Sequence, residues 1–158
     1  MDYAIPVVLL VLTIAIFFAI GRGSYASFGI PQVLLRILAA FPLLVSGIFL
    51  HFLRTATVAS IIPPVLPARI FLALLTGVLE IAGALGLFVH RFRRTAAFWI
   101  ASMMVAIIPA NVYAAGKVID GIQMPSVAIR TAMQVVYIIV VLLAGFGIPG
   151  RRQVRENN

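Results

Sequence analysis

The chain has 158 residues and contains no cysteine. It therefore cannot form disulfides, use a thiol in redox chemistry, or offer thiolate ligands to a metal ion or an iron-sulfur cluster. Acidic residues are also scarce, with four Asp and Glu against twelve Lys and Arg. Any acidic side chain inside an apolar segment is therefore a feature that needs a physical explanation.

Charge of either sign is rare, since 10% of the residues are charged and 63% are hydrophobic. A soluble domain of this length could not keep so many apolar side chains off its surface, so the composition predicts an integral membrane protein. The net charge of +8 does not indicate a nucleic-acid partner, because the basic residues form short clusters between apolar runs. We expect these clusters to contact the anionic head groups of membrane lipids.

Five apolar runs are each about long enough to cross a bilayer as a helix, which takes roughly 20 residues. The expected fold class is therefore all-α, an integral membrane helical bundle in which residues 1–158 form a single transmembrane domain. The first run could instead be a signal peptide, but Asp2 stands where such a peptide has basic residues, and we predict a span. The predicted spans are approximately residues 4–21, 33–53, 68–89, 95–115 and 126–146.

The connectors between these runs differ in character. Residues 55–67 carry Pro63, Pro64 and Pro67, which exclude a continuous helix, and their apolar residues predict a short segment packed at the membrane interface, where it could cover a site. Residues 116–125 form a polar connector. Neither connector suggests a second domain.

The distribution of basic residues predicts the orientation of the chain. With five spans, eight Lys and Arg fall on the side that holds the C-terminus and four fall on the other side. Because cytoplasmic loops carry the excess of basic residues, the C-terminus is expected in the cytoplasm and the N-terminus outside. The eight are Arg22, Arg36, Arg91, Arg93, Arg94, Arg151, Arg152 and Arg155, and the four are Arg54, Arg69, Lys117 and Arg130.

Glu80 is the acidic residue that stands out, since the apolar run at 68–89 contains no other. An ionisable group at this depth is costly and is by default a candidate functional residue. Thr76 lies four residues earlier and shares its helix face. Glu80 could bind a ligand, exchange a proton or serve redox chemistry. It could equally be a neutral acid whose hydrogen bonds only hold helices together.

Other polar residues are expected near the same outer half of the bundle. A rise of about 1.5 Å per residue places Glu80 and Tyr137 near the membrane midplane, with His51, Asn111 and Gln134 within two turns of the outer helix ends. We therefore predict an outward-facing polar pocket around Glu80, although Asn111 and Gln134 would serve equally as interhelical hydrogen-bonding residues. The candidate ligand-binding residues are Glu80, His51, Thr76, Asn111, Gln134, Tyr137 and Arg54.

Several chemistries do not fit this set. A metal site needs three or four convergent donors and only Glu80 and His51 are available, so no metal is expected. The two histidines, His51 and His90, fall on opposite sides, which excludes a haem held between them. No covalently bound cofactor is expected. Proton transfer, contact with a quinone and binding of a small amphipathic molecule all remain open.

Several short motifs follow one another along the second to fourth runs. They are Gly47-x3-His51-Phe52, then Pro64 and Pro67, Thr76-Gly-Val-Leu-Glu80, Leu85-Gly-Leu87 and Pro109-Ala-Asn111. Their order resembles that of the DoxX-like family of small bacterial membrane proteins. The resemblance implies a four-helix membrane bundle formed by the second to fifth runs, with the first run as an additional N-terminal helix. It also implies the bacterial cytoplasmic membrane. It assigns no reaction, because most members of that family have none.

Three functions are compatible with these observations. The first is a quinone-associated or redox-linked membrane subunit in which Glu80, His51 and Tyr137 contact a carbonyl head group. The second is a non-catalytic binder or transporter of a small apolar molecule or lipid, and the third is a subunit that docks another membrane protein. A weaker fourth is a sterol-isomerase-like activity using Glu80 and His51. The sequence does not say whether the protein is an enzyme.

Overall fold

The computed structural model describes residues 30–147 and Ala15. The predicted span at 4–21, apart from Ala15, and the basic tail after Pro149 lie outside the described residues. The elements in chain order are α2 (Ile30–Val45), the π-helix η1 (Ser46–Leu53), α3 (Thr55–Ile61), α4 (Arg69–Phe88), α5 (Arg93–Ala106), α6 (Ile108–Ala114), β1 (Val118–Ile119), β2 (Ile122–Gln123) and α7 (Val127–Phe146).

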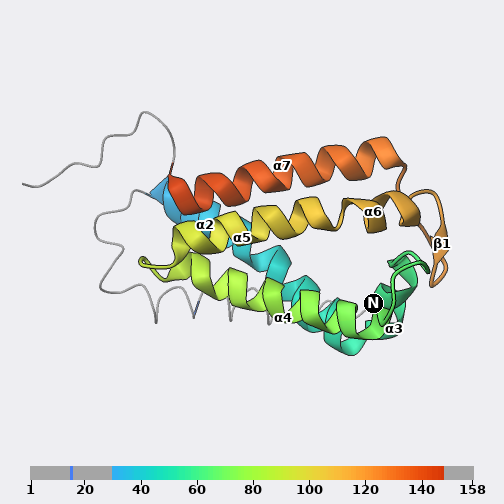
Figure 1. Cartoon of the computed structure of the whole chain (residues 1–158). Coiled ribbons are helices and arrows are strands. Elements are labelled where there is room, and N and C mark those ends of the chain that lie inside the picture. The colour runs from blue at the N-terminus through green and yellow to red at the C-terminus, as the bar shows by residue number, and fades with distance from the viewer. Residues whose placement is uncertain (1–14, 16–29, 148–158) are drawn as a thin grey trace, which may run out of the picture.

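The long helices form an up-and-down four-helix bundle (Figure 1). Around the bundle α2 packs on α4, α4 on α5, α5 on α7, and α7 back on α2. One apolar core joins all four helices and includes Leu43, Leu87, Ile100 and Val141. The start of α2, the α4–α5 loop and the end of α7 lie at one end of the bundle, and α3 with the hairpin lies at the other (Figure 1).

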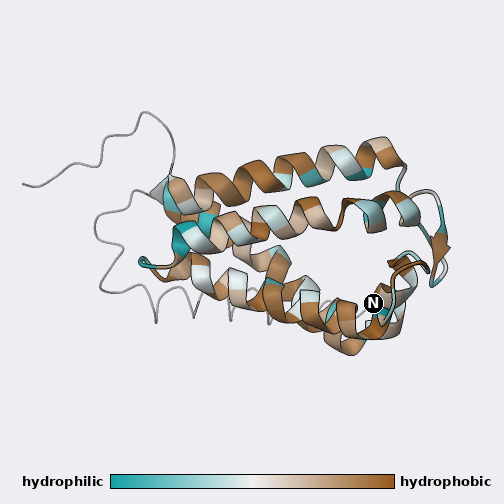
Figure 2. Ribbon diagram, viewed as in Figure 1, coloured by the Kyte–Doolittle hydropathy of each residue, from teal (hydrophilic) through white to brown (hydrophobic). Residues whose placement is uncertain are grey.

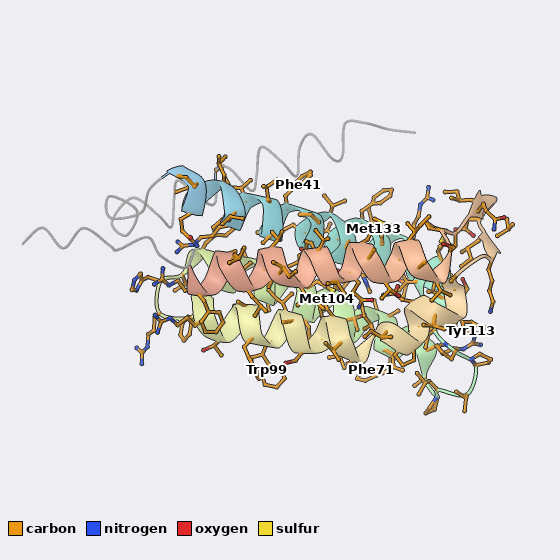
Figure 3. All side chains as sticks on the ribbon, turned by 90° about the horizontal axis from the view of Figure 1, so that it is seen from above. Phe41, Phe71, Trp99, Met104, Tyr113 and Met133 are labelled. Atoms are coloured by element: carbon orange, nitrogen blue, oxygen red, sulfur yellow. The ribbon has the colours of Figure 1, made fainter. Side chains whose placement is uncertain are left out.

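The outer surface of the bundle is apolar along the helices, whereas hydrophilic residues gather at the α4–α5 loop (Figure 2). Large side chains such as Phe71 and Trp99 point outward and are more than half exposed (Figure 3). An apolar surface of this extent is typical of a protein in lipid. Within the described part, three helices are long and apolar enough to cross a membrane, or four if the bent pair α5 and α6 counts as one span.

The predicted span at 95–115 is a bent pair of helices. The axes of α5 and α6 differ by 43°, and the break lies at Ile107. Pro109 explains the break, because it has no N–H to donate to the carbonyl of Val105 and its ring would clash there. The bend sets the direction in which Asn111 projects from α6.

The predicted span at 33–53 is also irregular, because the α-helix gives way to the π-helix η1 after Val45. An eight-residue π-helix is uncommon, and such segments occur mostly near functional sites. His51 lies within it. The interfacial segment predicted at 55–67 contains one short helix, α3, and a proline-rich turn.

One element departs from the expected all-α class. The connector at 116–125 folds into an antiparallel hairpin of β1 and β2, in which Ile119 faces Ile122. Asp120 and Gly121 form its two-residue turn, with φ of 49° and 75°. Such a turn needs positive φ at both positions, and Asp-Gly is a sequence that favours it. The Asp-Gly pair was a turn signal in the sequence, and the hairpin is a small addition to a described part that is mostly helical, as expected.

Candidate functional site

The site begins where η1 and α4 approach each other through two glycines. A side-chain carbon at Gly47 would lie 2.7 Å from Ile81 and 2.9 Å from the carbonyl oxygen of Gly77. A carbon at Gly77 would collide with Cβ of His51 and lie 3.0 Å from its Cγ. Glycine at both positions therefore brings the two backbones close together and lets the imidazole of His51 lie against α4.

The contacts of His51 determine which of its two ring nitrogens can gain or lose a proton. Its Nδ1 lies 2.5 Å from the carbonyl oxygen of Ala73, and this oxygen can only accept a hydrogen bond. Nδ1 therefore carries the hydrogen, and Nε2 is the nitrogen that gains or loses a proton. Thr76 Oγ1 lies 3.0 Å from the same Nδ1 and donates to the carbonyls of Leu72 and Ala73.

Glu80 completes the site from the next turn of α4. It is 5% exposed, so its side chain lies inside the bundle. Its Oε2 lies 3.6 Å from Nε2 of His51, beyond ordinary hydrogen-bond length, and has no hydrogen-bond partner among residues 30–147. One proton can reside on either group, giving a neutral acid beside a neutral imidazole or a carboxylate beside an imidazolium.

The short helix α3 covers the end of this site nearest Ala73. Ala59 and Ile62 are buried against Ala73, whose carbonyl oxygen accepts a hydrogen bond from His51. Thr55 at the start of α3 donates to the backbone carbonyl of His51 at 2.6 Å. The segment that the sequence placed over the site thus packs directly on its backbone.

Two other predicted residues form a separate hydrogen-bonded group between α6 and α7. Asn111 Nδ2 donates to Oε1 of Gln134 at 3.0 Å, and Gln134 Nε2 donates to the carbonyl of Met104. Arg130 Nη2 donates to Oδ1 of Asn111 at 2.6 Å. These contacts agree with the alternative interpretation of Asn111 and Gln134 as residues that link helices. Their hydrogen bonds described above do not involve Glu80.

Tyr137 and Arg54 complete the predicted set. The hydroxyl of Tyr137 donates to the carbonyl of Ala39 on α2, and the ring is close enough to Glu80 for an electrostatic interaction with its carboxylate. Arg54 is exposed and lies over the ring of Phe49 at 5.3 Å, so it does not join the His51 and Glu80 contacts. The structure thus brings His51, Thr76 and Glu80 together, with Tyr137 nearby.

The sequence analysis missed a polar group at the opposite end of the bundle. Arg36 is only 1% exposed, and its Nε donates to the carbonyl of Ala144 at 3.3 Å. Gln32 Nε2 donates to the same carbonyl at 2.8 Å and to that of Leu143 at 3.0 Å. These carbonyls lie in the last turn of α7, where intrahelical donors become scarce, and Leu143 also accepts from the N–H of Gly147 at 3.0 Å. A cation at this end also suits the helix dipole. Gln32 and Arg36 are four residues apart on α2, and this spacing was the signal in the sequence that could have revealed the group.

A metal centre finds no support in the part of the chain that the structure describes, where no three His, Asp or Glu residues cluster. Glu80 lines neither an apolar groove between α4 and α5 nor a basic cavity at the α4–α5 loop. The outward-facing pocket around Glu80 stays a prediction.

Comparison with known proteins places the chain in a family. It matches no curated protein and no solved structure. Residues 38–144 match the family described as Domain of unknown function (DUF8561). The matched residues run from α2 to the end of α7 and include His51, Thr76 and Glu80. Because the match covers more than half of the chain, the protein belongs to this DUF8561 family.

Proposed function

We propose that this protein is a quinone-associated subunit of the bacterial cytoplasmic membrane, in which His51 and Glu80 bind the carbonyl head group and exchange a proton with it. The observation that carries the proposal is the buried Oε2 of Glu80, which lies 3.6 Å from His51 Nε2 without a hydrogen-bond partner in residues 30–147. A native carboxylate left in this state is a natural attachment point for a polar ligand.

The chemistry of the pair suits a quinone. A quinone oxygen accepts a hydrogen bond, and the same oxygen becomes a hydroxyl donor after reduction. A protonated member of the pair can donate to the first form, and an unprotonated member can accept from the second. The hydroxyl of Tyr137 lies within electrostatic range of Glu80 and could serve as a further contact for the head group. In such a subunit the electrons come from a partner protein.

The residues that carry the DoxX-like resemblance include those of the proposed site. The short motifs that carry the resemblance contain Gly47, His51, Thr76 and Glu80, and these residues meet at the contact between η1 and α4. We propose the corresponding membrane arrangement of a four-helix core, built from α2 with η1, α4, α5 with α6, and α7, plus one additional N-terminal span at residues 4–21.

The test is binding of decylubiquinone to the purified full chain in lipid nanodiscs. We expect Glu80→Gln to fold with an unchanged melting temperature and to weaken binding by roughly 10–150-fold, since hydrogen bonds to charged groups contribute about 1.5–3 kcal/mol. Asp120→Asn is the matched control, because it makes the same carboxylate-to-amide change on an exposed turn and keeps a side-chain oxygen that can accept from Thr57. It should bind as the wild type does.

Other outcomes favour the other functions. If Glu80→Gln is silent in binding and stability while Glu80→Ala destabilises by about 1–3 kcal/mol, Glu80 is a structural link between helices. Movement of an apolar solute in proteoliposomes without a redox partner would favour a binder or transporter. Co-purification of a membrane-protein partner in fixed stoichiometry, with no quinone released from the complex, would favour an assembly subunit.

A further inference from the structure

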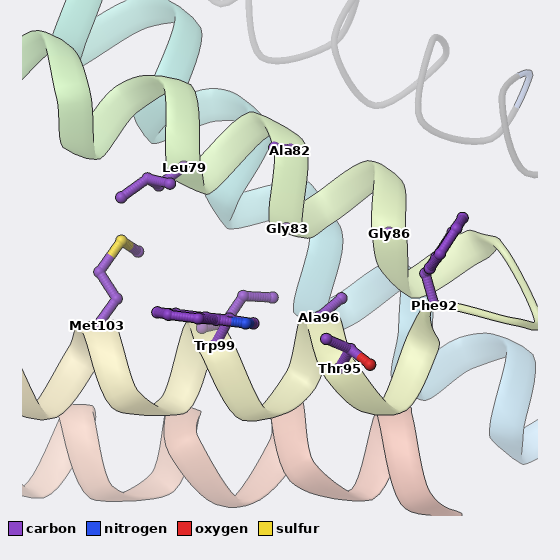
Figure 4. A pocket seen from close by; sticks show the side chains of 10 residues that line it. Leu79, Ala82, Gly83, Gly86, Phe92, Thr95, Ala96, Trp99 and Met103 are labelled. Atoms are coloured by element: carbon purple, nitrogen blue, oxygen red, sulfur yellow. The ribbon is translucent and has the colours of Figure 1, made fainter.

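A groove on the lipid-facing side of α4 and α5 is the second notable feature of the molecule. It has a volume of about 430 Å³. Leu79 and Met103 line one part of it, and Phe92 and Trp99 line the part nearer the α4–α5 loop (Figure 4). Phe92 is 55% exposed and Trp99 is 67% exposed, so these aromatic rings form open walls.

Glycines create the groove by removing side chains from its floor. A carbon added at Gly83 would lie 2.6 Å from Cγ1 of Ile100, and one added at Gly86 would lie 2.8 Å from Cβ of Ala96. The helices therefore approach closely and leave a furrow between their larger side chains. From Leu79 to Gly86 the furrow follows α4 for about 10 Å, at a rise of about 1.5 Å per residue.

The groove ends beside a basic cavity. This second cavity, of about 410 Å³, is lined by His90, Arg91, Arg93 and Arg94 at the α4–α5 loop. Phe92 joins the two features, because it lines the groove while its neighbours in sequence line the basic cavity. Arg91 also lies over the ring of Phe92 at 5.9 Å. Neither Glu80 nor Asp120 lines either cavity.

This juxtaposition matches one class of molecule. A narrow apolar furrow accepts a hydrocarbon chain, and guanidinium groups at its end favour an anionic oxygen-rich group, because their planar donors match a phosphate. We propose that the groove binds an acyl chain of an anionic phospholipid whose phosphate contacts Arg91 and Arg94. The site is separate from the His51 and Glu80 site and does not depend on its function.

The chain contains a single tryptophan, and it lies in this groove, so its fluorescence reports directly on the proposed ligand. The experiment uses the full chain in nanodiscs that mix phosphatidylglycerol with phosphatidylcholine. In one set only phosphatidylglycerol carries brominated acyl chains, and in the other only phosphatidylcholine does. At equal mole fraction we expect brominated phosphatidylglycerol to quench the fluorescence of Trp99 several-fold more strongly than brominated phosphatidylcholine does.

Variants then test the role of the two arginines. Arg91→Gln with Arg94→Gln should abolish the difference between the two lipids. The matched control, Arg69→Gln with Lys117→Gln, removes the same charge from exposed positions at the other end of the bundle and should keep the difference. Filling the groove with Ala82→Phe should reduce quenching by both lipids, whereas Val136→Phe on the exposed side of α7 should not.

Three results would overturn the proposal, and the first two need only the wild-type protein. Equal quenching by both lipids would mean that ordinary bilayer lipid covers the groove. Quenching by neither would mean that protein covers it, either residues 4–21 or a second copy of the chain. A phosphatidylglycerol preference that survives the double arginine substitution would place the head group elsewhere.

Discussion

At Gly77 a single added methyl group would displace the imidazole of His51. The new carbon would collide with Cβ of His51, so Gly77→Ala has to move η1 away from α4 or turn the ring away from Ala73 and Glu80. We expect a loss of about 1–3 kcal/mol in unfolding free energy, as for other overpacked contacts. Weaker binding of decylubiquinone should accompany it. Chemical denaturation in detergent micelles measures the first effect.

The control for this substitution is Ala132→Leu, which enlarges a side chain on the exposed face of α7. It should leave both the denaturation midpoint and quinone binding unchanged. A Gly77→Ala protein with the midpoint of the wild type would show that the contact between η1 and α4 tolerates a larger residue, and the explanation of Gly77 would be wrong.

Individual site residues differ in how far the sequence could predict them. Thr76 and Glu80 share a face because helical spacing is a local property, and burial of a lone carboxylate follows from its cost in lipid. Arg54 lies over the ring of Phe49, and its place as a ligand-binding residue stays a prediction, because a long side chain can adopt positions that helical spacing does not determine. The burial of Arg36 depends on the carbonyl of Ala144, which lies 108 positions away in sequence.

The hairpin at the surface stabilises α3, the short helix that covers one end of the site. Thr57 on α3 donates a hydrogen bond to the side chain of Asp120 in the turn. Gly121 has φ of 75°, a conformation that costs about 1–2 kcal/mol for a residue with a side chain. We therefore expect Gly121→Ala to loosen the hairpin and, through Asp120, to loosen α3.

Hydrogen–deuterium exchange measures this coupling. In Gly121→Ala, amide exchange should rise in residues 117–124 and in α3 and should stay unchanged in α7. Val118→Thr is the control, since it alters an exposed strand residue and keeps the turn. Faster exchange of the hairpin with an unaltered α3 would mean that Thr57 and Asp120 do not couple the two elements.

The helical elements could be predicted to within a few residues, because long apolar runs are a strong signal in a membrane protein. The π-helix was not predictable in the same way. Its hydrogen-bonding pattern depends on how η1 fits against Gly77 and Ile81 of α4, which is a tertiary contact. The bend could have been predicted from Pro109, which has no N–H to donate, but its angle of 43° could not.

For the whole molecule, the absence of cysteine makes the proposed orientation directly testable, because any introduced cysteine is the only thiol. Single substitutions at Asp2, Arg91, Val118 and Asn157 can each be labelled with a membrane-impermeant maleimide on intact spheroplasts. By the excess of basic residues on one side, we expect labelling at positions 2 and 118, and labelling at 91 and 157 only after permeabilisation.

Labelling of position 2 only after permeabilisation would contradict an outside N-terminus and hence the five-span arrangement. Loss of that cysteine from the mature protein, with position 157 still protected, would instead mean that the first run is cleaved and four spans remain. Labelling at positions 91 and 118 from the same side would exclude any arrangement in which α5 and α6 together cross the membrane.

The cap that Gln32 and Arg36 place on the carbonyls of Leu143 and Ala144 also bears on how the protein is made. During synthesis α2 leaves the ribosome about a hundred residues before the end of α7. Until α7 arrives, the guanidinium that the finished bundle buries has to remain at the water-facing edge of the insertion machinery or pair with a lipid phosphate. The last helix therefore completes the burial of Arg36, and a chain truncated before α7 would lack the carbonyl of Ala144 to which this guanidinium donates.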